Sequence, residues 1–453
     1  MTFDTLDTTR FEDDSALLQQ AVRLAHEAGE TLVIPPRNPR TGENLWVLPR
    51  AVRLPSHSSI LMDGCHIRHA DNTFDNLFKN ENARTPAGNT LEGRQTDISI
   101  IGRGHALLDG GLHNGLTERT HNKMGMPCFV NSAIHFCNVE RFELSGFTVT
   151  EPRYWGVTFH FCAEGSVHDI RFACSGHSPN QDGIDLRRGC RDISICNITG
   201  FTGDDVVALT NLPGPSDMSC DVPGLCSDIC RVIIRDLECG TSDERGIVRL
   251  LCNNGMKVHD VLIDNLIDAS TPDRYLRAGS AVRINENGYY REGMAEPAYG
   301  DMKNITVRNV NTRARIGVRM SCNAARVLID NIQMREDGGT ALLLGKGDFR
   351  HIRVRNLGYD DLTCPPDSDD NVTEGPQNKR QPSALPLEQR RICAVYFQNS
   401  TVSDMKIDGV CAGRNLTHVF GGSLTGQVLV RDAVCLNDAV PMTEKDNLIS
   451  FVD

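Results

Sequence analysis

Asn180-Gln181-Asp182-Gly183-Ile184-Asp185-Leu186, followed by Gly203-Asp204-Asp205-Val206-Val207-Ala208-Leu209, is the stretch that decides the fold. Both segments place an acidic residue two positions before a short apolar strand, and Asp182 and Asp204 are 22 residues apart. If the chain coils with that period, the two acids stack in one column. Asp182, Asp204 and Asp205 then meet on one face, as acid/base cleavage of a glycosidic bond requires.

The same pattern repeats along the chain, from about residue 58 to residue 453. Short β-rich strands alternate with small turns, and a second strand follows each first strand. First strands are expected to start at Val157, Ile184, Val206, Ile247, Val282, Val318, Leu342, Val395 and Val419; second strands at Ile193, Val232, Val261, Ile305, Val327 and Ile352. A recurring Asn near the end of the second strands (Asn265, Asn331, Asn356) suggests stacked turns with Asn ladders.

A period of this size indicates a solenoid, a propeller or another repeat array. Spacings such as 157 to 184, 184 to 206 and 318 to 342 are 27, 22 and 24 residues. That length, with two or three strands per turn, predicts an all-β right-handed parallel β-helix. The L-x-x-L-x-L signature of leucine-rich repeats is missing, and a propeller blade needs four antiparallel strands. We therefore expect residues 1–453 to form a single β-helix domain.

One helix is predicted, over about residues 13–30. Asp13-Asp14-Ser15 can cap it, and Gly29 ends it. Its apolar stripe is Leu17, Leu18, Ala21, Leu24, Ala25 and Ala28. The helix would cap the open end of the β-helix, which otherwise presents unpaired strand edges. Inserted loops are expected near 112–128, 211–228, 286–300 and 359–390, the last of which is polar and Pro-rich.

Charge and composition argue against some classes of partner. The formal net charge is -12 and no Lys/Arg-rich block occurs, so nucleic-acid and membrane-surface partners are not predicted. The N-terminus lacks an apolar signal-peptide core, and no apolar run reaches membrane-span length, so a cytoplasmic location is expected. The sequence leaves a homo-oligomer open.

The 17 cysteines are odd in number and scattered, and we interpret most as small buried hydrophobes in a reducing compartment. Cys220, Cys226 and Cys230 form a local group without a paired C-x2-C. No metal or other cofactor is therefore predicted.

The predicted columns bring further polar residues near the acids. Asp182 over Asp204 would be a near-contact of like charges, about 4.8 Å apart on adjacent strands. Such a pair costs stability, which an acid catalyst would justify. Asp is common in turns, and a turn role alone could explain each of the two motifs separately. A turn role does not explain an aligned pair of Asp residues flanked by Trp155, Arg245 and Arg283.

These motifs resemble family 28 of the glycoside hydrolases, the polygalacturonase family of right-handed β-helices. The residues behind the resemblance are Leu32-Val33-Ile34-Pro35-Pro36, Gly102-Arg103-Gly104 through Asp109-Gly110-Gly111, Pro152-Arg153-Tyr154-Trp155, Asn180-Gln181-Asp182 and Asp204-Asp205. The last two motifs, at their spacing of 22 residues, are the features most specific to this family. The resemblance extends over most of the chain.

The resemblance implies an inverting hydrolysis. Asp204 would be the general acid, and Asp182 and Asp205 would activate the water. Inversion needs roughly 6.5–9.5 Å between acid and base to leave room for that water. No cofactor is implied.

Two departures from the family pattern bear on the substrate. Glu244-Arg245-Gly246 stands where the family has Gly-His-Gly, and Arg283-Ile284-Asn285 stands where it has Arg-Ile-Lys. One of the two cations that grip a uronate carboxylate is thus lost, although Arg245 can supply another. Altered specificity is expected, toward a uronate-containing or other plant-derived oligosaccharide. His177 could replace the family's histidine or be an exposed loop residue.

The predicted substrate-binding residues are Arg245, Arg283, Trp155, Asn180, Asp185, His177, Asn285 and Tyr154. Tyr154 and Trp155 would give a sugar-stacking platform; the alternative is a pair of aromatics packed under a loop. Tyr289 and Tyr290 are further rim candidates. Long loops that close a groove into a pocket, together with the absence of a secretion signal, favour exo action on imported oligosaccharides.

Two other functions stay open. A β-helix polysaccharide lyase or epimerase would use a base with Ca²⁺ or an arginine to remove the proton beside a uronate. A non-catalytic carbohydrate-binding β-helix would use the same carboxylates without turnover.

Overall fold

The computed structural model describes most of the chain in two compact units. Described residues are 1–3, 6–111, 128–176, 180–213, 220–242, 245–271, 277–286, 294–335, 339–359, 393–413, 416–438, 440–443 and 449–451. The predicted loops at 112–128, 211–228, 286–300 and 359–390 fall wholly or partly outside these ranges. The first unit comprises residues 1–208 and 213–232, and the second comprises 209–212 and 233–453. The single-domain organisation stays a prediction.

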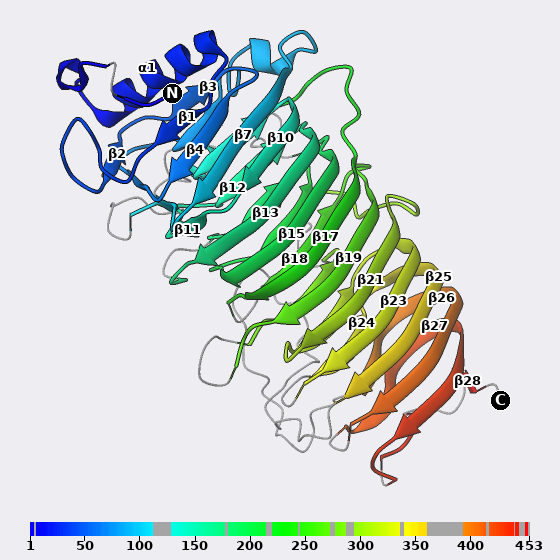
Figure 1. Ribbon diagram of the computed structural model, residues 1–453. Coiled ribbons are helices and arrows are strands. Elements are labelled where there is room, and N and C mark those ends of the chain that lie inside the picture. The colour runs from blue at the N-terminus through cyan, green and yellow to red at the C-terminus, as the bar shows by residue number, and fades with distance from the viewer. Residues whose placement is uncertain are drawn as a thin grey trace. The chain divides into compact units, whose positions relative to one another are not determined.

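The first unit is a coil of short parallel strands in three stacks. One stack is β1 (Leu32–Ile34), β4 (Ser59–Asp63), β7 (Gln95–Arg103), β10 (Val139–Ser145), β13 (Ala163–Ala173) and β15 (Arg191–Phe201). The second is β2 (Trp46–Leu48), β5 (His66–His69), β8 (Leu107–Asp109) and β11 (Thr148–Thr150), which also pairs with β13. The third is β3 (Val52–Leu54), β6 (Phe78–Asn80), β9 (Ile134–Cys137), β12 (Val157–His160) and β14 (Ile184–Leu186). Figure 1 shows β7, β10, β13 and β15 side by side.

The second unit repeats this architecture. One stack is β18 (Gly246–Cys252), β20 (Ser280–Ile284), β22 (Ile316–Met320), β24 (Thr340–Leu344) and β26 (Cys393–Ala412). The other is β19 (Val258–Asp268), β21 (Met302–Thr312), β23 (Ala324–Met334), β25 (Gly347–Tyr359), again β26, then β27 (His418–Cys435) and β28 (Ile449–Phe451). β16 (Val207–Asn211) and β17 (Ile229–Gly240) have residues in both units. The fold is the predicted right-handed parallel β-helix.

The predicted helix is confirmed as α1 (Asp14–Ala28). The Asp13 side chain caps it by accepting the Ala16 N–H at 2.8 Å, and Gly29 ends it in the left-handed conformation with φ +66°. Leu17, Leu18, Ala21, Val22 and Ala25 are among its buried residues. Leu24 is half-buried and Ala28 is exposed, so the buried stripe is shifted toward Val22.

Most of the predicted strand register is confirmed. Val157 pairs with Ile184, Val282 with Val318, Val318 with Leu342, and Leu342 with Val395. The second strands align as expected through Val261, Ile305, Val327 and Ile352. Three predicted pairs are wrong by one residue. Val282 pairs with Val248 rather than Ile247, Val395 pairs with Phe420 rather than Val419, and Ile184 aligns with Val207 rather than Val206.

Aromatic rings fill the interior and amides line the turns. Phe136 and Phe159 lie on the adjacent strands β9 and β12, and Phe142 stacks on Phe159 with ring centroids 4.8 Å apart. The Asn331 amide donates to Asn309 at 2.8 Å, and Asn309 donates to Asp264 at 2.8 Å. Asn309 and Asn331 are left-handed, a conformation that Asn tolerates better than most residues. The predicted Asn ladder is thus present at Asn331, whereas Asn265 and Asn356 donate to Asp236 and Asp330 instead of to another Asn.

Candidate active site

Three carboxylates gather in the first unit. One oxygen each of Asp182, Asp204 and Asp205 lies within 4.8 Å of those of the other two. Asp182 and Asp204 are 2% and 3% exposed, and Asp205 is fully buried. The predicted convergence of these side chains is therefore present in the structure.

A tight turn before β16 holds two of the acids. The Thr202 hydroxyl donates to the Asp204 carbonyl at 2.5 Å, and the Asp205 N–H donates to the Asp204 carboxylate at 3.0 Å. The N–H groups of Gly203 and Asp204 both donate to the Gln181 carbonyl, at 3.1 and 3.2 Å. The Asp204-Asp205 turn is thereby fastened to the residue that precedes Asp182.

This turn corrects the predicted column. Gly183 donates to the Asp205 carbonyl and Ile184 to the Val206 carbonyl, both at 2.9 Å. Val157, whose partner is Ile184, donates in the same way to the carbonyl of Gly183. The pattern aligns Ile184 with Val207, so Asp205, rather than Asp204, stands opposite Asp182. The turn takes up one more residue than an ungapped repeat allows.

The burial of three acids at this spacing has an electrostatic consequence. Interactions between charges are much stronger away from water than in it. Three like charges so close together repel one another. Three carboxylates can also supply both a proton donor and the ligands of an activated water, which are the parts that acid/base hydrolysis needs.

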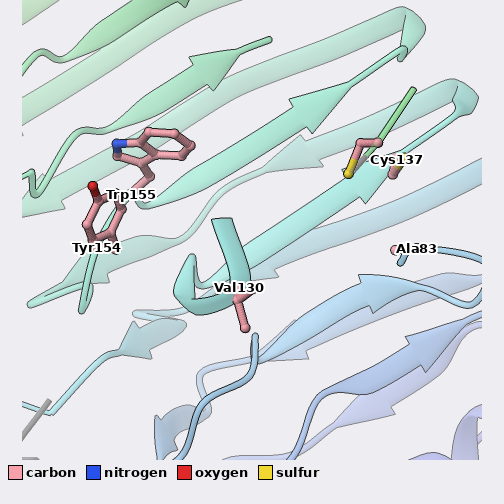
Figure 2. Close-up of a cluster of buried hydrophobic side chains, with 6 residues drawn as sticks. Ala83, Val130, Cys137, Tyr154 and Trp155 are labelled. Carbon is pink, nitrogen blue, oxygen red and sulfur yellow. The ribbon is translucent and has the colours of Figure 1, made fainter. Parts of the chain in front are cut away.

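Tyr154 and Trp155 lie in an apolar cluster with Ala83, Val130, Cys137 and Cys220 (Figure 2). Tyr154 is 4% exposed and Trp155 is 8% exposed, which leaves little ring surface open for stacking on a sugar. The Arg187 guanidinium lies 4.7 Å from the centroid of the Trp155 ring. The stacking role stays a prediction.

Two other predicted residues lie close by in sequence and in space. The Asn180 amide donates to the Tyr154 hydroxyl at 3.0 Å, which connects the N-x-D motif to the aromatic cluster. Asp185 is fully buried on β14, where it pairs with Thr158 of β12. His177 lies outside the described residues, as do Glu244, Tyr289 and Tyr290.

The predicted cations belong to the second unit, where the structure adds two that sequence reasoning missed. Arg283 pairs in register with Arg249 on one side and with Arg319 on the other. Arg283 also forms an ion pair with Glu286 at 3.1 Å. Burial alone would raise the pKa of Glu286. The nearby cations, Arg283, Arg249, Arg319 and Arg245 in decreasing order, lower that pKa below its usual value.

We call Arg249, Arg283 and Arg319 the arginine column. Arg249 was missed because the one-residue error in register placed Val248 beside Arg283. Arg319 follows Val318 as Arg283 follows Val282, but the predicted column ended at Arg283 and did not include Arg319. Asn285 is fully buried and left-handed, with φ +63°. It accepts from the Glu286 N–H at 3.0 Å and donates to the Cys252 carbonyl at 3.4 Å, so its contacts stabilise the local turn.

The local cysteine group does not assemble. Cys220 is buried in the aromatic cluster, Cys226 is exposed, and Cys230 accepts a hydrogen bond from Arg231 at 3.2 Å. Most cysteines in the described ranges are buried free thiols. None of the helices in the described part of the chain has both the length and the apolar character needed to cross a bilayer.

Comparison with known proteins identifies the fold. No protein-family model matches the chain. A search of curated proteins finds no match either. Among solved structures, the tailspike protein of E. coli bacteriophage HK620 in complex with pentasaccharide is 13% identical, with a TM-score of 0.51; the match covers 97% of this chain and 74% of that one. The exopolygalacturonase from Thermotoga maritima is 12% identical, with a TM-score of 0.46, and the match covers 95% of this chain and 91% of that one. At 13% identity the tailspike match shows the β-helix fold alone.

Proposed function

We propose that this protein is a glycoside hydrolase, inverting and exo-acting, that cleaves a plant-derived, uronate-containing oligosaccharide. The observation behind the proposal is the cluster of Asp182, Asp204 and Asp205, whose carboxylates come from two successive coils to within 4.8 Å of one another. Drift has no structural reason to bury three like charges together, because their repulsion lowers stability. The family 28 resemblance of the same residues supports the proposal.

The reaction needs one proton donor and one activated water. Asp204 donates its proton to the leaving glycosidic oxygen as the bond to the anomeric carbon breaks. Asp182 and Asp205 hold a water and take its proton as the water oxygen bonds to that carbon. Asp182 and Asp205 stand opposite each other just before β14 and β16, and Asp204 lies one residue earlier in the turn, which distinguishes the donor from the pair.

The spacing of the cluster makes the stereochemistry a sharp test. Inverting enzymes usually separate the acid and base carboxyl groups by about 6.5–9.5 Å, and retaining enzymes by about 5–5.5 Å. The 4.8 Å limit is closer to the second class. We keep inversion because a third carboxylate gives the water two ligands without a covalent intermediate. NMR of the first-formed product should show the opposite anomer to the substrate, and a retained anomer would make one Asp a nucleophile.

The reaction class is tested on a panel of uronate-containing and neutral plant oligosaccharides. Mass spectrometry should show a saturated monosaccharide released from chain ends. A product absorbing in the near ultraviolet, especially one that requires Ca²⁺, would instead identify a lyase. Tight sugar binding without any product would identify a binding protein. On a polymer, a fast loss of viscosity with few new reducing ends would contradict exo action.

The arginine column supports an anionic sugar as the substrate, since arginine forks match carboxylates in shape and charge. Arg283→Ala should raise KM for a uronate substrate by about 10- to 100-fold, because a hydrogen bond to a charged group contributes about 1.5–3 kcal/mol. KM for the methyl ester of the same substrate should change little.

Arg308→Ala is the matched control for that variant. Arg308 is an exposed arginine of the same unit, paired with Asp264 at 2.7 Å, and its loss should leave both KM values unchanged. Equal losses on the uronate and its ester would exclude carboxylate recognition by Arg283.

A further inference from the structure

A second cluster of reactive side chains lies in the first unit, apart from the three acids. His135 and Cys137 alternate along β9, so both project from the same face of the sheet. His160 on β12 is the register partner of Cys137. Three side chains with metal-binding atoms thus stand on two adjacent strands. They face away from the interior that Phe136 and Phe159 fill.

The fourth side chain comes from a distant part of the chain. Cys220 reaches this face, and its sulfur lies within 4.8 Å of ring nitrogens of His135 and His160. Cys137 and Cys220 pack in one cluster of buried side chains. All four residues are fully buried.

The spacing of the two histidine nitrogens fits a tetrahedral metal site. His135 Nε2 and His160 Nδ1 are 3.3 Å apart. In a tetrahedral zinc site with bonds of about 2.0 Å to nitrogen, two nitrogen ligands are about 3.3 Å apart. The same distance suits a hydrogen bond between two imidazoles, so the histidine pair alone does not identify a metal site. The Cys220 sulfur adds a third ligand atom within 4.8 Å of both, and Cys137 lies outside this group of three.

We infer that a structural divalent metal ion of the zinc type binds between β9, β12 and the segment that begins at Cys220. Its ligands are Nε2 of His135, Nδ1 of His160 and the sulfur of Cys220. Two imidazoles and a thiolate are ligands that zinc prefers, and all three residues are fully buried. The ion fastens the segment that begins at Cys220 onto the third strand stack.

The place of the ion gives it a positioning role. Cys137 and Cys220 pack in the same cluster as Tyr154 and Trp155. Tyr154 accepts the hydrogen bond from Asn180, two residues before Asp182. Without the ion, the wall behind the N-x-D motif would lose one of its attachments.

Elemental analysis of the full chain, purified under reducing conditions and incubated with Zn²⁺ alone, tests the inference. We expect one Zn²⁺ per chain, a lower Tm after removal by a strong chelator, and recovery on adding Zn²⁺ back. With Co²⁺ in its place, the visible spectrum should show tetrahedral coordination and thiolate charge transfer. Cys220→Ser and His160→Gln should each lose the bound metal.

Cys226→Ser is the matched control, because Cys226 belongs to the same segment but is exposed and lies outside the cluster. It should bind metal as wild type does. The Co²⁺ spectrum of the wild-type chain tests for the metal site even if a ligand variant does not fold. Absence of bound metal after incubation, or a Cys137–Cys220 disulfide found by alkylation and mass analysis, would overturn the inference.

Discussion

Replacing Asp204 by Asn is expected to lower kcat by about 100- to 10,000-fold on a natural oligosaccharide, the range usual for loss of a general acid. Asn has nearly the shape of Asp but no proton to give to the leaving oxygen. The loss should shrink on an aryl glycoside, whose leaving group departs without a proton. Steady-state kinetics on the two substrates measures both effects.

Asp192→Asn is the control for Asp204→Asn. Asp192 is a partly exposed carboxylate of the same unit, paired with Arg231 at 2.6 Å, and its loss should leave kcat unchanged. Asp182→Asn and Asp205→Asn should be impaired equally on both substrates, because their proposed task is to activate water. If Asp204→Asn were equally slow on the aryl glycoside, Asp204 would not be the acid.

Arg153→Met is expected to destabilise the first unit by at least about 3 kcal/mol, because three buried backbone carbonyls lose the hydrogen bonds that Arg153 donates. Arg153 is 1% exposed and donates to three backbone carbonyls, of Gly110 at 2.9 Å, of Ala70 at 2.6 Å and of Thr73. Methionine fills much of the volume but leaves these carbonyls without their donor, at a cost of about 1–3 kcal/mol for each buried unsatisfied group. Urea denaturation followed by circular dichroism measures the change.

Arg103→Met is a suitable control for Arg153→Met. Arg103 is an exposed arginine that pairs with Asp63 at 2.7 Å, so its loss should cost no more than about 1 kcal/mol. A midpoint for Arg153→Met equal to that of the control would show that water replaces the three hydrogen bonds at no net cost.

Much of the fold could be predicted from sequence because each coil repeats the same local pattern. Apolar residues at Val157 and Ile184 must face the interior of the first unit, those at Val282 and Val318 the interior of the second, and parallel strands align each pair. The helix could also be predicted, since Asp13 and Gly29 are common residues at the start and the end of a helix. The N-x-D and Asp-Asp motifs brought Asp182, Asp204 and Asp205 together for the same reason.

What could not be predicted depends on single-residue shifts and on distant contacts. A strand that slips by one residue leaves no trace in the apolar pattern when two apolar residues follow each other, as at Ile247-Val248 and Val206-Val207. Because of this one-residue error, the prediction placed Val248 rather than Arg249 beside Arg283. The group of His135, His160 and Cys220 was missed because Cys220 is far in sequence from the two histidines, and no fixed spacing connects them.

The extra residue in the turn before β16 explains how two consecutive acids can serve one reaction. Successive side chains of a strand point to opposite faces, so neighbours such as Asp204 and Asp205 would be parted if both belonged to β16. Asp204 escapes this alternation because it lies in the turn, and both carboxylates can approach Asp182. Deleting one residue here would restore the alternation and turn one acid toward the apolar interior. The proposed catalytic centre, although built on a repeat, thus depends on a place where the repeat is broken.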